Sequence, residues 1–268
     1  MTIPLAVIWS LLASAGWIAV ASLTMLLRPS AATDLVNIQA CMALAYLLAI
    51  FLMARVHAFQ HTLADFLGIR HTHPLLYGLA ACIGVSLTIP AEIIRRAIER
   101  RWHTPPEEVL DQISAFRMDT PIRHVLIPLV VIAVGPLIEE LFFRGALQRG
   151  LRRVYPDATV VPLVAVLFAA AHQDARAMLP LFIVGLMLCT LRSGSGSLLP
   201  PLIAHMCFNA VGIFEMLRGQ GSAETETTPL PLSWSVAGIA ATAVFTAAFV
   251  LVARRSSRAQ SARQEDST

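Results

Sequence analysis

The hydrophobic residues of this chain fall into long runs separated by short polar segments. About 20 consecutive apolar residues are enough for one helix to cross the hydrocarbon core of a bilayer. The candidate spans are about Pro4–Leu27, Leu35–Ala54, Leu75–Ile94, His124–Leu147, Val160–His172 with its continuation, Leu179–Leu191, Leu198–Leu217 and Trp234–Ala253. The pattern therefore predicts an all-α, polytopic membrane protein of about eight transmembrane helices.

Two of these spans have an interruption, because Asp174 and Arg176 lie between the fifth and the sixth. The first span carries no charged side chain and lacks the basic start of a secretory signal peptide. It is therefore expected to be retained as a transmembrane helix.

The segments between the spans carry their own patterns. In "AEIIRRAIERRWH" (91–103) apolar and arginine residues lie mostly on opposite sides of a helix, which is typical of a helix at the headgroup boundary. "PPEEVLDQISAF" (105–116) predicts a second surface helix. "RSGSGSLLPP" (192–201) predicts a short flexible turn, 221–229 an exposed loop, and the polar tail from Arg254 a disordered end.

Composition supports a membrane class, since 56% of the residues are hydrophobic, 14% are charged and the mean hydropathy is +0.68. All 20 basic residues are arginine. Outside the connection between the third and fourth spans, they divide eleven to three in favour of the side that holds both termini, which predicts cytoplasmic termini. The net charge of +3 suits an anionic lipid bilayer and gives no indication of nucleic-acid binding. The four cysteines, Cys41, Cys82, Cys189 and Cys207, lie within predicted spans without paired spacing, which predicts small core residues that form neither disulfides nor a zinc site.

Polar side chains inside the later spans are the candidate chemistry. Three pairs have i, i+4 spacing and so share a helix face, and they are Glu140 with Arg144, Phe168 with His172, and His205 with Asn209. Glu139 lies beside Glu140, about 100° around the helix. At about 1.5 Å per residue, Glu139, His172 and His205 lie roughly 12, 18 and 10 Å from the same side of the membrane. We therefore expect these side chains to meet in one intramembrane cavity.

Structural roles compete with catalytic ones for each residue. Glu140 and Arg144 could form a buried ion pair that only joins helices, and a lone His172 could be a hydrogen-bonded core histidine. His205 and Asn209 could be interhelical hydrogen-bond partners. Arg144 can neutralise only one carboxylate, however, so Glu139 stays without a counterion. The whole set at one depth favours chemistry over structure.

Hydrolysis is the chemistry that these residue types favour. Glu139 could deprotonate a water that His172 positions, while His205 and Asn209 donate hydrogen bonds to the oxyanion on a scissile carbonyl. A metal is the competing version, in which Glu139, His172 and His205 bind Zn²⁺ or another divalent ion with an open position for water. The His-Glu-x-x-His helix of many zinc proteases is absent, so spacing alone does not establish zinc.

The three motifs "EELFFR" (139–144), "FAAAH" (168–172) and "HMCFN" (205–209) together resemble those of a known family. It is the CAAX protease and bacteriocin-processing (CPBP or Abi) family of intramembrane proteases, which includes the type II CAAX prenyl endopeptidases. The resemblance covers roughly residues 125–215. It implies that Glu139 is the catalytic base, Glu140 an assisting carboxylate held with Arg144, His172 the water-orienting residue, and His205 and Asn209 the oxyanion donors. The family has been described both as metalloproteases and as metal-independent glutamate proteases. No cofactor is favoured, because a glutamate–histidine pair with separate oxyanion donors uses all the motif residues without a metal.

The resemblance implies an intramembrane endopeptidase that cleaves a membrane-associated or lipidated protein or peptide near its C-terminus. It divides one structural domain into N-terminal helices with the amphipathic connection (1–123), a catalytic core of helices four to seven (124–217), and the last helix with the tail (218–268). Arginine without lysine and abundant alanine indicate a bacterial inner-membrane protein. The alternatives are a non-catalytic scaffold or bacteriocin-immunity protein on the same fold, and a proton- or ion-coupled transporter.

Overall fold

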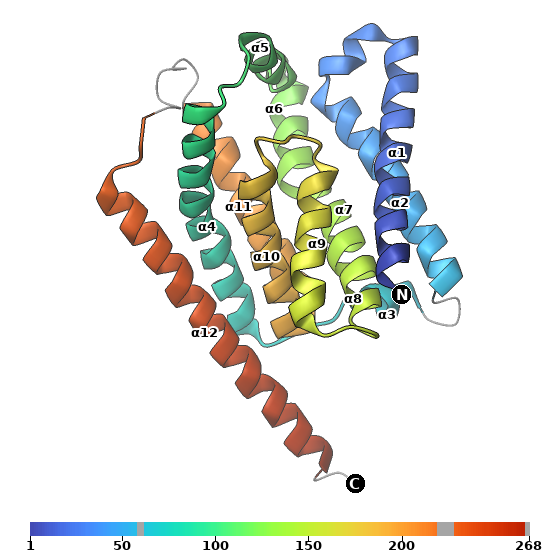
Figure 1. Cartoon of the computed structure of the whole chain (residues 1–268), viewed down its shortest axis with the longest axis vertical. Coiled ribbons are helices and arrows are strands. Elements are labelled where there is room, and N and C mark those ends of the chain that lie inside the picture. The colour runs from blue at the N-terminus through green and yellow to red at the C-terminus, as the bar shows by residue number, and fades with distance from the viewer. Residues whose placement is uncertain (58–61, 219–227, 266–268) are drawn as a thin grey trace.

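The protein is a bundle of helices in a computed structural model that describes residues 1–57, 62–218 and 228–265 (Figure 1). No strand occurs in these three ranges. In chain order the elements are α1 (Ile3–Leu27), η1 (Pro29–Thr33), α2 (Leu35–His57), α3 (Leu63–Leu67), α4 (Pro74–Arg101), α5 (Pro106–Ala115), α6 (Pro121–Pro128), η2 (Leu129–Val134), α7 (Gly135–Glu140), η3 (Leu141–Gln148), α8 (Arg149–Leu151), α9 (Asp157–Ala171), α10 (Met178–Ser195), α11 (Leu199–Arg218) and α12 (Leu232–Glu265).

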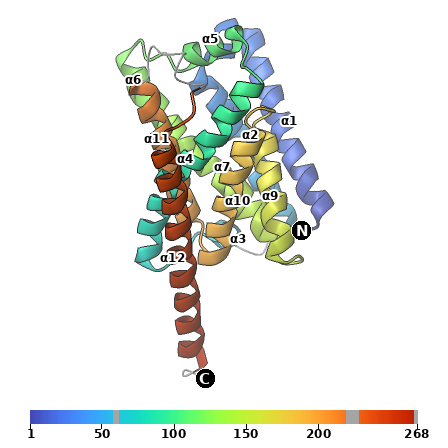
Figure 2. The same ribbon diagram turned by 60° about the vertical axis from the view of Figure 1, so that its left-hand side comes forward.

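The predicted membrane architecture is confirmed. Seven of the described helical segments are long and apolar enough to cross a bilayer, and the segment from α6 to α8 counts as one of them. The predicted fifth span is α9, which is apolar but only 15 residues long. With α9 the chain makes eight passes, so both termini lie at the same end of the bundle, the lower end in Figures 1 and 2. We call this end the N-terminal face; there the Met1 ammonium donates to the Gly150 carbonyl at 3.1 Å.

Two predictions about the connecting segments are wrong. The amphipathic segment 91–103 is not a separate surface helix, because α4 runs without a break from the third span to Arg101. Glu92 supports this continuation, since it forms ion pairs of 2.7 and 2.6 Å with Arg95 and Arg96 one turn later. The tail is also helical to Glu265, because extending a formed helix through residues with good helix propensity costs little.

Other predicted connections agree with the structure. Segment 105–116 contains α5, and the turn at 192–201 is short, with Gly196 in the left-handed conformation between α10 and α11. The loop predicted at 221–229 lies almost entirely outside the described residues. All four cysteines are free thiols, but only Cys41 and Cys189 are buried, so the prediction of core positions is wrong for the exposed Cys82 and the partly buried Cys207.

The span that carries Glu139 and Glu140 is not a regular α-helix. Its segments η2 and η3 are π-helical and flank α7, and the Gly135 N–H bonds to the Val130 carbonyl five residues earlier. Pro128 and Pro136 lack an N–H donor, which disturbs the usual i to i−4 pattern near them. π-helical turns widen a helix and often occur at functional sites, so the carboxylates sit in a locally widened part of the span.

Two apolar cores hold the bundle together. The first joins α1, α2, η3 and α9, where Tyr46 stacks on Phe142 with ring centres 4.8 Å apart. The second joins α4, α10, α11 and α12. In this core α4 approaches α11 so closely that a Cβ on Gly84 would lie 2.1 Å from the Ala204 carbonyl oxygen. The absence of a side chain at Gly84 therefore sets the position of the helix that carries His205.

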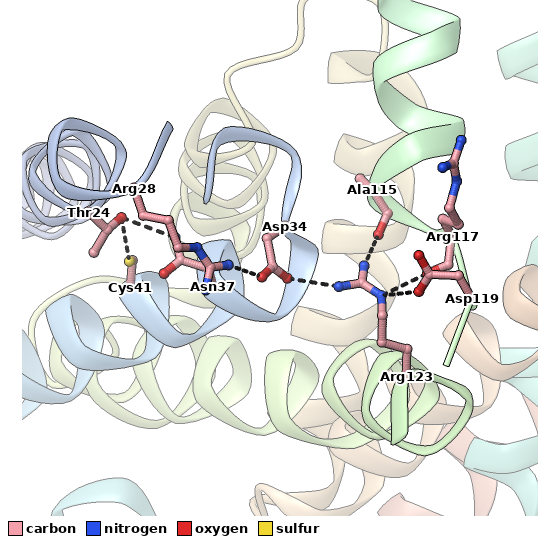
Figure 3. Close-up of polar contacts among 9 residues, drawn as sticks. All are labelled: Thr24, Arg28, Asp34, Asn37, Cys41, Ala115, Arg117, Asp119 and Arg123. Carbon is pink, nitrogen blue, oxygen red and sulfur yellow. Dashed lines mark hydrogen bonds and ion pairs between the residues drawn. The ribbon is translucent and has the colours of Figure 1, made fainter. Parts of the chain in front are cut away.

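At the end of the bundle opposite the N-terminal face, charged side chains connect neighbouring helices (Figure 3). Asp34, at the start of α2, pairs with Arg28 at 2.5 Å and with Arg123 of α6 at 3.3 Å. Arg123 also donates to the Arg117 and Ala115 carbonyls after α5. These contacts fix the α1–α2 hairpin against the start of the glutamate-bearing span.

The charges that interrupt the predicted fifth and sixth spans lie in the turn between α9 and α10. Arg176 pairs with Glu108 of α5, and its guanidinium lies 5.8 Å from the ring centre of Trp102. The turn is therefore anchored to the α4–α5 connection and leaves the apolar helices on both sides uninterrupted.

Candidate active site

A cavity of about 240 Å³ lies between α1, α2, α7, α9, α10 and α11. Four of the predicted site residues line it, namely Glu139, His172, His205 and Asn209, and the ring of Phe168 forms part of its wall. The expected meeting of these side chains in one intramembrane cavity is confirmed. Glu140 and Arg144 lie directly behind the wall and are fully buried.

Glu140 and Arg144 form a buried ion pair. Arg144 Nη1 donates to Glu140 Oε1 at 2.8 Å, and its Nη2 donates to the Gly185 carbonyl on α10 at 3.4 Å. Burying two charges is favourable only when their geometry and remaining hydrogen bonds are good, and here Glu140 Oε2 has no partner in the described part of the chain. This orphaned oxygen indicates that the pair does more than join helices.

The ring of Phe168 contacts three other side chains of the candidate site. The Arg144 guanidinium lies 4.3 Å from the centre of its ring, a distance typical of a cation–π contact. The rings of His172 and His205 lie 4.9 and 5.9 Å from Phe168, both nearly perpendicular to it. One aromatic ring thus contacts the arginine and both histidines, which gives a physical reason for the phenylalanine in the second motif.

His172 lies directly after the last residue of α9, where the chain turns towards α10. Its Nδ1 lies 2.9 Å from the Phe168 carbonyl oxygen. Since a carbonyl only accepts, Nδ1 is the protonated nitrogen, and Nε2 of the neutral ring carries the lone pair. His172 is therefore oriented to accept a proton or a hydrogen bond at Nε2.

His205 lies between the two carboxylates. Its Nδ1 is 3.0 Å from Glu140 Oε1, and its Nε2 is 3.8 Å from Glu139 Oε2. Because the carboxylate accepts, Nδ1 carries the hydrogen of the neutral ring. Nε2 then has a lone pair, so His205 can donate to an oxyanion only after it takes up a proton. The structure adds this condition to the role that the motif implies.

Asn209, one turn further along α11, donates one amide hydrogen to the Val131 carbonyl at 2.8 Å. Val131 belongs to the π-helical segment η2. A side-chain amide has two N–H donors, so the second is available to the cavity that Asn209 lines. This donor does not depend on any protonation step.

Glu139 is the only site carboxylate that contacts the cavity, and 13% of its side chain is exposed. Arg144 contacts Glu140 and makes no ion pair with Glu139. The two adjacent glutamates thus have different surroundings, because Glu140 is ion-paired with Arg144 whereas Glu139 faces the cavity. This is the division of partners that the sequence predicted.

A metal centre would need Glu139, His172 and His205 to gather around one ion. Tetrahedral zinc, about 2 Å from each ligand, requires donor atoms within about 3.3 Å of one another. Among the residues that the structure describes, no three His, Cys, Asp or Glu side chains are grouped in this way. The residues as arranged do not fit a three-ligand metal site.

Two cavity residues on the first two helices lie outside the three motifs and were not predicted. Trp17 of α1 and Gln39 of α2 line the cavity, and Trp17 Nε1 and Gln39 Oε1 are buried without a hydrogen-bond partner in the described chain. A Cβ on Gly135 would lie 3.2 Å from Gln39 Oε1, so the amide faces the start of α7. The signal that could have found Gln39 is an uncharged amide inside an apolar span.

Comparison with known proteins locates the resemblance in the chain. Residues 121–211 match the family model described as type II CAAX prenyl endopeptidase Rce1-like. An uncharacterised 24.3 kDa protein of Escherichia coli is 32% identical over 115 residues, which is 41% of this chain and 52% of that protein. The chain therefore spans about half the length of this curated relative, and no solved structure gave a significant match.

The matched segment begins at α6 and ends in α11, so it includes all the predicted site residues from Glu139 to Asn209 and leaves out Trp17 and Gln39. The family description names a protease activity and the helices are those of an integral membrane protein. Residues 121–211 are therefore similar to the type II CAAX prenyl endopeptidase Rce1-like family, consistent with the CPBP group that the motifs predicted.

Proposed function

We propose that the protein is an intramembrane endopeptidase in which Glu139 activates the attacking water. The observation that carries this proposal is the unequal surroundings of the two glutamates, since Arg144 holds Glu140 while Glu139 faces the cavity. A carboxylate without a bound cation, beside two histidines, is suited to accept a proton from water. A purely structural ion pair needs only one of the two glutamates.

The proposed first step is attack of water on the scissile carbonyl. Glu139 accepts one proton from the water, and Nε2 of His172 accepts a hydrogen bond that orients it. The oxygen of the water forms a bond to the carbonyl carbon, and the negative charge moves to the carbonyl oxygen. The free amide hydrogen of Asn209 stabilises this oxyanion.

Collapse of the tetrahedral intermediate breaks the carbon–nitrogen bond. The proton on Glu139 passes to His205 Nε2, which lies 3.8 Å from Glu139 Oε2 and approaches it by a small side-chain movement. Glu140 stabilises the resulting imidazolium through its contact with Nδ1. The protonated His205 assists Asn209 at the oxyanion and then supplies the proton that the leaving amine requires.

Trp17 and Gln39 are proposed to hold the substrate backbone. An extended peptide offers N–H donors and carbonyl acceptors, which match the unpaired Gln39 Oε1 and Trp17 Nε1. A cavity inside apolar helices favours a membrane-associated or lipidated protein cleaved near its C-terminus. Among bacterial proteins such substrates would be membrane-anchored peptides.

The experiment that tests this function uses purified protein and a membrane proteome. Wild type and Glu139→Gln are incubated with the same solubilised membranes, and new C-termini are identified by mass spectrometry. We expect new C-termini with wild type only. If the protein is a scaffold, an immunity protein or a transporter, neither wild type nor Glu139→Gln will produce new C-termini. Equal cleavage by wild type and Glu139→Gln would contradict the role of Glu139 as the base.

A second arm of the same assay addresses metal dependence. The protein is treated with a chelator and passed into metal-free buffer before the substrate is added. We expect full activity, because the site residues do not group as ligands of one ion. Loss of activity that added Zn²⁺ restores would require the metal-dependent alternative.

A further inference from the structure

Three arginines meet at the N-terminal face, away from the cavity. Arg192 ends the membrane part of α10, Arg149 begins α8, and Arg70 follows α3. Arg192 and Arg149 meet at Gly68, where a Cβ would lie 2.3 Å from Arg192 Nη2 and 2.9 Å from Arg149 Nη1, and Arg70 lies within electrostatic range of both. Gly68 has a φ of 70°, which favours glycine, and its missing side chain leaves room for both guanidinium groups. We call Arg70, Arg149 and Arg192 the arginine cluster.

The cluster has no counterion within the described residues. Arg192 is 3% exposed and donates only to the carbonyls of Arg144 and Leu67, and Arg70 donates to the Gly196 carbonyl. Arg149 Nη1 is buried and has no hydrogen-bond partner there. Carbonyls satisfy donors but do not neutralise charge, so the three like charges are held together without an ion pair to any described carboxylate, and Asp65 and Glu140 act on Arg149 and Arg192 only from a distance.

The nearby acidic groups are engaged elsewhere. Asp65 is within electrostatic range of Arg149, but its carboxylate accepts from the Thr62 hydroxyl at 2.6 Å and forms no ion pair with the cluster. Asp157 pairs with Arg152 at 2.6 Å. Arg152 is thus an exposed arginine with its own counterion, whereas Arg149 is half-buried beside two further arginines and forms no ion pair with a described carboxylate.

We propose that the arginine cluster binds a phosphate-bearing anion at the membrane boundary. Guanidinium groups match phosphate oxygens with paired hydrogen bonds, and basic pockets between transmembrane helices hold anionic headgroups. The phosphate can belong to an anionic phospholipid or to a soluble molecule. In both cases the phosphate contacts the exposed Arg70 and the accessible part of the half-buried Arg149 guanidinium, and the buried Arg192 adds positive charge from within the bundle.

The test measures thermal unfolding of the full chain in nanodiscs at constant ionic strength. One set contains only phosphatidylcholine, a second contains phosphatidylglycerol as well, and a third contains phosphatidylcholine with inorganic phosphate or pyrophosphate in the buffer. Arg149→Gln is the test variant, and Arg152→Gln is the matched control at the same face. A rise in unfolding temperature with phosphatidylglycerol identifies a lipid ligand, and a rise with phosphate or pyrophosphate identifies a soluble one.

For wild type and Arg152→Gln we expect the anion to raise the unfolding temperature by several degrees, and for Arg149→Gln by less than half as much. In pure phosphatidylcholine we expect Arg149→Gln to unfold at a higher temperature than wild type, because one repelling charge is gone. Equal anion effects in Arg149→Gln and wild type, or no effect of any anion on wild type, would overturn the proposal.

Discussion

The Nδ1 atom of His205 lies 3.0 Å from Oε1 of Glu140, the same oxygen that accepts from Arg144. One buried carboxylate oxygen thus links the helix of the first motif to the helix of the third. The contact fixes the orientation of the His205 ring and directs Nε2 towards Glu139. Glu140 is therefore expected to act through His205 and Arg144, while Glu139 acts on the substrate.

Glu140→Gln should lower both stability and activity. The substitution leaves the buried Arg144 charge without its partner, which typically costs about 3–5 kcal/mol. It also weakens the orientation of His205, for which we expect a loss of cleavage rate on the order of 10²-fold or more. The measurements are the unfolding temperature in nanodiscs and the cleavage rate on a substrate found by C-terminal proteomics.

The matched control for this variant is Glu92→Gln. Glu92 also pairs with arginines, but these pairs are partly exposed and each is worth about 0–1 kcal/mol. We expect a small change in unfolding temperature and no change in cleavage. Equal losses in the two variants would contradict a special role for Glu140.

Phe168→Leu should disturb the site through Arg144. The substitution removes a desolvated cation–π contact of about 2 kcal/mol and the packing of both histidine rings. Phe214→Leu is the control, because Arg218 lies 4.2 Å from the Phe214 ring centre at an exposed position. Unfolding temperature should fall clearly only for Phe168→Leu, and an equal fall would show that burial of the contact is unimportant.

Gly84→Ala should displace α11 relative to α4. The new methyl group would lie 2.1 Å from the Ala204 carbonyl oxygen, next to His205, and overpacking of this kind costs about 1–3 kcal/mol. Gly78→Ala in the same helix has open space around it and should change stability by no more than about 1 kcal/mol. Paired measurements of unfolding and cleavage test this, and unchanged stability of Gly84→Ala would contradict the close helix contact.

Gln39→Leu should weaken substrate binding more than catalysis. If Gln39 Oε1 accepts from the substrate backbone, its loss should raise KM by about tenfold, since one hydrogen bond is worth about 1 kcal/mol or somewhat more, with kcat nearly unchanged. Asn37→Leu is the control, because Asn37 bonds to Thr24 outside the cavity. An unchanged KM in Gln39→Leu would remove this residue from the substrate site.

The sequence predicts the spans and the gathering of the motif residues around one cavity for identifiable reasons. Long apolar runs directly indicate membrane-spanning helices. The i, i+4 spacing correctly predicted that Glu140 lies beside Arg144 and His172 beside Phe168. Similar depth in three spans was enough to predict that Glu139, His172 and His205 meet. The catalytic roles of these residues stay predictions until cleavage is measured.

The remaining features depend on tertiary packing that no short pattern contains. The direction of His205 towards Glu140 follows from how closely α4 and α11 approach at Gly84. The unpaired atoms of Trp17 and Gln39 are recognisable only when all six helices around the cavity are in place. The continuation of α4 through segment 91–103 was missed because an amphipathic stretch does not indicate whether a helix begins there or simply continues.

The most direct test of the account is the cleavage rate of Glu139→Gln in nanodiscs on an identified substrate. Its control is Glu215→Gln, which changes an exposed carboxylate on α11 outside the cavity. We expect Glu139→Gln to fold and bind the substrate like wild type but to cleave it roughly 10²- to 10⁴-fold more slowly, with Glu215→Gln unaffected. A Glu139→Gln protein that cleaves at the wild-type rate would contradict the assignment of Glu139 as the base.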